Sequence, residues 1–205
     1  MTRLILRDHE ASAWHAGRLS AVVRLVKDQP PEGHKFIGVC TSSTNIRNEG
    51  KFLLAAGEMP LTIDHRYYRC PLGAPGNPLW IAETWAGSDS RIAIVYKANK
   101  PTFWRDISWR SPATMPRWAS RYDAVHVGSR IVRVQAVTTE DAIACGAVET
   151  RLVLAETSVW SMQPWPEPIC GDSAVNAFMA QFIADHGQAA WDRNEWVWIH
   201  RIGRE

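Results

Sequence analysis

The sequence has few cysteines, and none of them stands in a spacing typical of a metal site. The four cysteines lie far apart in the 205 residues, at Cys40, Cys70, Cys145 and Cys170. No CxxC motif and no Cys/His spacing indicates zinc, so neither a metal nor another cofactor is predicted. The spacing leaves open whether these residues are thiols or disulfides.

Long apolar segments are also missing. No run approaches the roughly 18 apolar residues that a membrane-spanning helix needs, and the N-terminus has no continuous apolar core of a signal peptide. We therefore expect a reduced protein of the cytoplasm with no membrane partner. A secreted protein with two disulfides is the alternative.

A strong net charge is absent as well, because the formal charge is only +2 and no polybasic tail is present. The length is sufficient for one domain with a full core. Any basic surface must therefore come from clustering of scattered arginines, for example Arg105, Arg110, Arg117, Arg121, Arg130 and Arg133.

Tryptophan, in contrast, is abundant, with 11 residues. The segment 109–121 holds two tryptophans, three arginines and two prolines, which predicts a stiffened loop rather than a helix or a strand. A flat ring beside a guanidinium group can stack on a base and bind a phosphate. Packing of the tryptophans in the core, with solvated arginines, explains the same composition equally well.

The amino-acid sequence of several segments resembles the ASCH family of PUA-like domains, and most closely its long phage or prophage type. The resemblance lies in MPRWASR (115–121), the β-rich run 125–137 with Thr139–Ala144 after it, Cys70–Gly76 leading into Leu79–Trp85, and Trp191–Ile199. It implies an α+β fold with a PUA-like small β-barrel of five to six mostly antiparallel strands and two or three short helices. We expect a single domain over 1–205 with insertions at about 31–69 and 147–172. A phage-encoded protein would act in the host cytoplasm.

Local patterns predict the elements of this fold. Helices are expected at 10–17, at 139–145 and from an N-cap at Ser173 to His186, where Gly187 ends the helix. Strands are expected at 22–26, 79–85, 92–96 and 196–202, together with a hairpin over 125–137 that turns at Gly128-Ser129.

The resemblance also indicates where catalytic residues would lie. Some family members resemble amidohydrolases of modified nucleosides, which use a Lys and a Thr of an N-terminal signature and a Glu on a short helix. Gly17 and Arg24 fit that signature, but the three catalytic positions read Leu19, Val22 and Cys145. Leucine and valine have no titratable group, so we do not expect the family's amidase reaction. Ser20 and Glu83 are the remaining weak catalytic candidates.

A binding site without that chemistry remains. A base could stack on Trp118, with its edge read by Glu83 or Ser120 and its phosphate held by Arg117 or Arg121. Glu83 is expected to pair with Arg24 or with an arginine of the 117–121 segment. The predicted ligand-binding residues are Arg24, Trp80, Glu83, Arg117, Trp118, Ser120 and Arg121.

The sequence therefore favours binding of RNA, or of a nucleotide or modified nucleobase, by a PUA-like barrel. One alternative is a hydrolase, either a modified-nucleoside amidohydrolase or a ribonuclease, with displaced residues such as Ser20, Glu83 and Arg24. Another alternative is a phage-type anti-defence or protein-interaction module that contacts a host protein through the tryptophan-rich segment 159–166.

Overall fold

The computed structural model describes residues 1–41, 46–56, 64–87, 94–99, 107–152, 157–162 and 170–204. Four helices are described, α1 (Asp8–His15), α2 (Thr139–Ala144), α3 (Ala174–His186) and α4 (Gln188–Asp192). The strands are β1 (Thr2–Ile5), β2 (Ala21–Leu25), β3 (Lys35–Val39), β4 (Phe52–Ala56), β5 (Asp64–Tyr68), β6 (Pro78–Ala82), β7 (Trp85–Gly87), β8 (Ile94–Tyr96), β9 (Asp123–Arg133), β10 (Val148–Leu152), β11 (Thr157–Ser161), β12 (Cys170–Gly171) and β13 (Trp196–Arg204).

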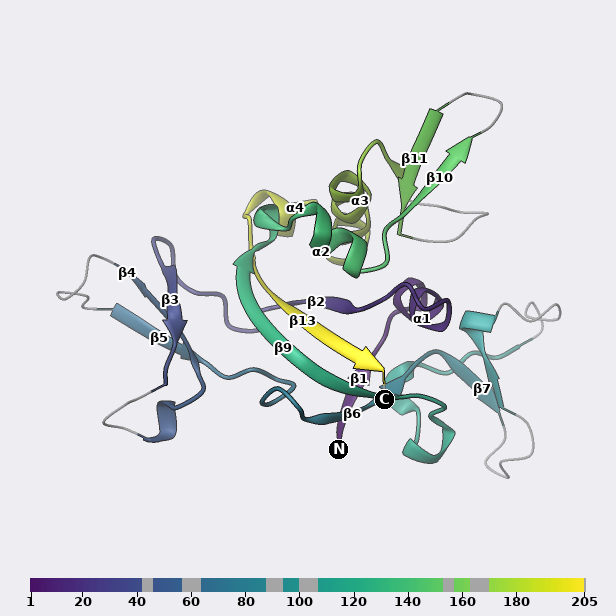
Figure 1. Ribbon diagram of the computed structural model, residues 1–205, viewed down its shortest axis with the longest axis horizontal. Helices are drawn as coiled ribbons and strands as arrows, with labels where there is room; N and C mark the ends of the chain where they lie inside the picture. Colours follow the sequence, from purple (N-terminus) through teal and green to yellow (C-terminus); the bar gives the residue numbers. More distant parts are fainter. Residues whose placement is uncertain are drawn as a thin grey trace.

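A curved five-stranded sheet forms the centre of the molecule (Figure 1), with the strand order β1-β6-β9-β13-β2. All of its pairs are antiparallel except β1 with β6, which run parallel. β1 and β2 stand at the two edges, and no closed barrel is found among the described residues. The predicted α+β class is confirmed, since the chain consists mostly of strands with a few short helices.

β13 is buried on both faces because two separate apolar clusters lie against it. Trp196, Trp198 and Ile202 face a cluster with the side chains of α1, β1 and β6. Val197 and Ile199 face a second cluster, which includes Phe178 and Phe182 of α3. A strand that is covered on both sides reads as a nearly continuous apolar run, which is the pattern of 196–202.

α2 and α3 begin and end where their capping residues predict, whereas the helix expected at 10–17 begins and ends two residues earlier, as α1. Ser173 Oγ accepts a hydrogen bond from the Asn176 backbone N–H at 3.1 Å, and α3 ends before Gly187, whose φ is +85°. Thr138 caps α2 and forms a reciprocal capping box with Asp141. The predicted helices at 139–145 and 173–186 are confirmed to within one residue.

Three smaller sheets surround the central one, with the orders β3-β4-β5, β10-β11-β12 and β7-β8. The first lies within the predicted insertion 31–69 and the second within 147–172. Figure 1 shows β3–β5 on one side of the central sheet, and β7 and the β10–β11 pair on other sides. The two expected insertions thus each contain a small sheet of regular strands.

The predicted hairpin over 125–137 is wrong. β9 runs unbroken from Asp123 to Arg133 and pairs along its length with β13. The pairing register shifts between Arg201 and Ile202, where one extra residue of β9 is accommodated. Gly128 and Ser129 therefore lie beside a β-bulge inside one long strand, rather than in a turn.

Two further observations concern the chain as a whole. No helix of the described residues is long and apolar enough to cross a membrane. The four cysteines all lie in described segments, and no disulfide joins them.

Candidate functional site

The segment 109–121 is a loop with two single 3₁₀ turns, at Pro112–Thr114 and Arg117–Ala119. Trp118 is 37% exposed and lies edge-on to the buried Trp85, with ring centroids 6.4 Å apart. Arg117 donates to Asp123 Oδ1 at 2.6 Å and also lies over the Trp80 ring, 5.9 Å from its centroid. The predicted loop is confirmed, and one of its two tryptophans is at the surface.

Glu83 lies at the base of this loop, and both of its carboxylate oxygens are hydrogen-bonded. Its carboxylate is 2% exposed and accepts two hydrogen bonds from Arg121, Nε to Oε1 at 2.8 Å and Nη2 to Oε2 at 2.9 Å. The Arg121 guanidinium also packs over the rings of Tyr96 and Tyr122, at 4.1 and 4.9 Å from their centroids. The expected pairing of Glu83 with an arginine of the loop is confirmed. Because both groups are satisfied by each other, this pair positions the loop and offers little to a ligand.

Ser120 and Trp80 also serve the packing of this region. Ser120 Oγ lies 2.7 Å from the Ile81 carbonyl oxygen and 3.1 Å from that of Tyr122, so its hydroxyl bonds to the backbone. Trp80 is only 9% exposed, on the buried strand β6. Of the predicted binding residues around the loop, Trp118 and Arg117 are the ones that present substantial surface.

Arg24 pairs with a residue that the sequence did not suggest. From β2 it donates to both carboxylate oxygens of Glu10 on α1, at 2.5 and 2.8 Å, and to the Ile5 carbonyl at 2.6 Å. Burial alone raises the pKa of Glu10, but the Arg24 charge and hydrogen bonds outweigh that effect and lower the pKa to about 2. Arg24 thus joins α1 to β2 and the end of β1.

The positions named by the family resemblance carry no group poised for proton transfer. Leu19 and Val22 are buried in the core. Burial raises the pKa of the Cys145 thiol to about 12, and the nearby carboxylates of Glu10 and Asp141 add to that effect. Ser20 is exposed, and no side-chain hydrogen bond to a base is described for it. A neutral thiol and an unactivated hydroxyl are weak nucleophiles.

A cleft lies away from this loop, where the small sheet β3-β4-β5 meets the edge strand β2. It has a volume of about 610 Å³, and sites for small ligands generally measure about 300–1,000 Å³. β2 and the residues after it form one wall, β5 and the residues after it form the other, and Trp198 of β13 also contributes. The lining residues are Arg24, Leu25, Val26, Lys27, Asp28, Arg66, Tyr67, Tyr68, Arg69, Pro71 and Trp198.

The cleft is basic and aromatic. Its described lining includes four cations and one carboxylate, and Arg24 is neutralised by Glu10, which leaves Lys27, Arg66 and Arg69 against Asp28. Arg66 lies 3.5 Å from Asp64, and no carboxylate within the described ranges lies at ion-pair distance from Lys27 or Arg69. Burial raises the pKa of Tyr68, so its phenol keeps its proton as a hydrogen-bond donor. The arrangement can hold an anion beside an aromatic face.

Sequence reasoning missed this cleft although a signal was present. The run His65-Arg66-Tyr67-Tyr68-Arg69 interleaves cations with rings inside the stretch interpreted as an insertion. Its partners Lys27 and Trp198 lie about 40 and 130 residues away along the chain. Only the packing of β5 beside β2 and β13 brings them together.

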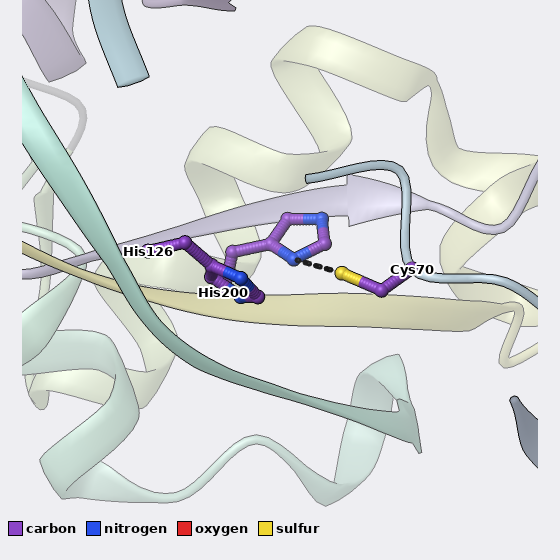
Figure 2. A group of neighbouring side chains, drawn as sticks. All are labelled: Cys70, His126 and His200. Atoms are coloured by element: carbon purple, nitrogen blue, oxygen red, sulfur yellow. Dashed lines mark hydrogen bonds between the residues drawn. The ribbon is translucent and has the colours of Figure 1, made fainter. Parts of the chain in front are cut away.

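A second polar group includes Cys70, whose chain neighbours Arg69 and Pro71 line the cleft. Cys70, His126 and His200 are all buried, and they place one sulfur and two ring nitrogens within 4.8 Å of one another (Figure 2). Ser129 Oγ lies between the two rings, 2.6 Å from His126 Nε2 and 2.6 Å from His200 Nδ1. Burial lowers the pKa of His200 to about 3, and the charge of Arg24 contributes, so this imidazole is neutral. This cluster is the one group of side chains in the described residues that could hold a metal ion.

Comparison with known proteins gives no relative. No protein family matches the sequence, and neither a curated protein nor a solved structure is detectably similar to the chain.

Proposed function

We propose that the chain is a PUA-like domain of the ASCH type that binds RNA, or a nucleotide or modified base, in the cleft between β2 and β5. The observation that carries this proposal is the composition of the cleft, in which Lys27, Arg66 and Arg69 stand beside Tyr67 and Tyr68. Cations that follow a phosphate backbone, next to rings on which bases stack, are the usual elements of single-strand binding.

The ligand chemistry follows from the positions of these groups. The three cations lie at the exposed rim, where they can reach phosphates while the anion keeps part of its hydration. Tyr67 is half-buried, so one part of its ring is available for stacking on a base. The Tyr68 phenol can donate to a base edge or a ribose oxygen.

Equilibrium titration with short RNA, short DNA and a set of nucleotides tests the proposal. If three cations each neutralise one phosphate, log K should fall with log salt with a slope on the order of −2, since each phosphate of a single strand contributes about −0.7. Arg66→Ala should weaken binding and reduce the slope by about 0.7. The matched control is Arg151→Ala, which removes an exposed arginine from β10, on another side of the molecule.

The outcomes separate the alternatives. Saturable binding that is weakened by Arg66→Ala but not by Arg151→Ala supports the proposal. Equal loss in both variants indicates nonspecific charge attraction, and no binding of any ligand contradicts the proposal. Mass spectrometry of the ligand after the titration detects turnover, which is what the hydrolase alternative requires.

The structure offers little to that hydrolase. Glu83 is paired with Arg121, Arg24 is paired with Glu10, and Ser20 stands at the surface. Activation of a serine hydroxyl requires a base within hydrogen-bond reach, and none is described at Ser20.

One observation favours the protein-interaction alternative, at a place other than the one predicted. The edge strand β3 exposes Phe36, Ile37 and Val39 at 40, 43 and 44%. Exposed apolar edge strands are sites for pairing with another chain. In the predicted segment 159–166, Trp160 is half-buried on β11, and 163–169 lie outside the described residues. Capture of a host protein that is lost in Ile37→Lys, with RNA binding intact, would support this second candidate.

A further inference from the structure

The buried cluster of Cys70, His126 and His200 brings three potential metal ligands within 4.8 Å of one another. Cys70 follows β5, His126 is on β9 and His200 is on β13, so three distant parts of the chain converge. In Figure 2 the sulfur of Cys70 points toward the His200 ring, and the His126 ring lies beside it. The Cys70 Sγ is 3.9 Å from His200 Nδ1.

The β-bulge in β9 brings the two histidines to the same side of the sheet. His200 lies opposite Ser129, but Ile202 lies opposite His126, so Val127 is the extra residue and points outward at 58% exposure. In a regular strand without the bulge, positions 126 and 129 would face opposite sides of the sheet, because side chains alternate along a strand. Bulges of this kind re-aim side chains and are frequent beside functional sites.

The hydrogen bonds identify which ring nitrogen of His126 donates to the backbone. The Ala74 carbonyl oxygen can only accept, so His126 Nδ1, at 3.0 Å from it, carries the proton. His126 Nε2 then presents its lone pair to the centre of the cluster. Metal-binding histidines commonly donate their other ring N–H to a backbone carbonyl in this way, which fixes both the tautomer and the ring orientation.

The Ser129 hydroxyl lies at the centre of the cluster. It donates to His126 Nε2 and accepts from His200 Nδ1, and the Cys70 thiol lies 3.3 Å from the same oxygen. This network leaves His200 Nε2 buried without a hydrogen-bond partner among the described residues. The hydroxyl therefore stands at a point on which two nitrogens and one sulfur converge.

We infer that Cys70, His126 and His200 bind a divalent metal ion, for which Zn²⁺ is the best match. One thiolate and two imidazoles are ligands that zinc prefers, at about 2.3 Å for sulfur and about 2.0–2.1 Å for nitrogen. A tetrahedral ion with these bond lengths separates sulfur and nitrogen by about 3.6 Å, and the Cys70–His200 distance is 3.9 Å. The Ser129 hydroxyl lies where the three ligand atoms converge, so it must rotate aside to admit the ion, and the displaced hydroxyl or a water molecule then takes the fourth position. Binding releases the Cys70 thiol proton to solvent.

The position of the site gives the ion a structural role. Arg69 and Pro71 flank Cys70 and line the ligand cleft, and the Trp198 ring stacks on the His200 ring with centroids 5.6 Å apart. An ion that ties Cys70 to β9 and β13 would hold one wall of the cleft against the central sheet.

The test is direct titration of chelator-treated protein with Zn²⁺ and with Co²⁺, whose absorption reports tetrahedral geometry and thiolate ligation. We expect one ion per chain and a thiolate-to-cobalt band. Cys70→Ser should remove the band and weaken zinc binding by more than the about 10- to 100-fold that is typical for loss of an outer-shell partner. A variant that combines Cys40→Ser with Cys170→Ser changes two cysteines outside the cluster, so it should bind as wild type does.

A second variant keeps the inference testable if Cys70→Ser folds poorly. Ser129→Ala keeps all three ligand atoms and should still bind one Zn²⁺ per chain. Failure of the wild type to bind either ion contradicts the inference, as does binding that survives Cys70→Ser but is lost when Cys40 and Cys170 are replaced. In both cases the cluster is a hydrogen-bond network centred on Ser129.

Discussion

The ion pair of the buried Glu10 with the partly buried Arg24 predicts a defined dependence of stability on pH. The pKa of Glu10 is lowered from 4.5 to about 2, because the Arg24 guanidinium more than compensates for burial. The difference is about 2.5 pH units, and each unit corresponds to about 1.4 kcal/mol. The ionised form of Glu10 therefore stabilises the folded state by on the order of 3 kcal/mol at neutral pH.

The sign of the effect follows from the direction of the shift. A carboxyl group with a lowered folded-state pKa contributes its full stability above the unfolded-state pKa and loses it as the pH falls through the folded-state pKa. The contribution of Glu10 should be complete above about pH 5 and should disappear between about pH 4.5 and pH 2.

Urea denaturation of wild type and Glu10→Gln across this pH range measures the contribution. At neutral pH the variant should lose about 3–5 kcal/mol, because Arg24 is left partly buried without its counter-charge. The difference between the two proteins should shrink as the pH falls toward 2. Glu149→Gln, at an exposed position of β10, is the matched control. A constant difference between wild type and Glu10→Gln over the whole range would refute the reasoning.

Three other predictions concern the packing around the candidate sites. Glu83→Gln should cost about 3–5 kcal/mol in urea denaturation, since it leaves Arg121 partly buried and unpaired, but ligand affinity of the folded fraction at the cleft should not change. Gly146→Ala should cost about 1–3 kcal/mol, because a Cβ at its φ of +102° would lie 2.8 Å from the Ala13 Cβ. Gly33→Ala has a similarly positive φ and open space around it, so it should cost less, and equal losses would rule out the steric contact. Cys145 should react more slowly with an alkylating agent than the exposed Cys170, since burial raises its pKa to about 12, and mass spectrometry of the labelled peptides decides the order.

Local sequence signals located the elements whose limits depend on local chemistry. Ser173 and Gly187 bracket α3 as cap and stop, and Thr138 with Asp141 caps α2. The charge pair of Glu83 was also predictable, because a carboxylate on a buried strand needs a cation and the nearby loop is rich in arginine.

The β9 strand shows where local signals mislead. Gly128-Ser129 between two β-branched runs has the pattern of a hairpin turn, but pairing with β13 on both sides of it keeps the strand continuous. The glycine is used beside a bulge instead of in a turn. That choice depends on a partner strand about 70 residues away in sequence, so the local pattern cannot reveal it.

The candidate sites themselves depend on contacts that are distant in sequence. Arg24 was expected to meet Glu83 or to bind ligand, but α1 places Glu10 against it. The cleft joins residues after β2 with β5. The cluster of Cys70, His126 and His200 joins three segments that share no recognisable spacing. Sequence identified the residue types suited to nucleotide binding, and the fold decides which of them share a surface.

Photo-crosslinking of bound RNA, with the modified residues identified by mass spectrometry, tests most directly whether the cleft is the ligand site. Our account predicts crosslinks at Tyr67, Tyr68 or the neighbouring residues of β5, and their loss in a variant that combines Arg66→Ala with Arg69→Ala. Crosslinks confined to Trp118 and the 109–121 loop, unchanged in that variant, would contradict it and would place the ligand at the loop.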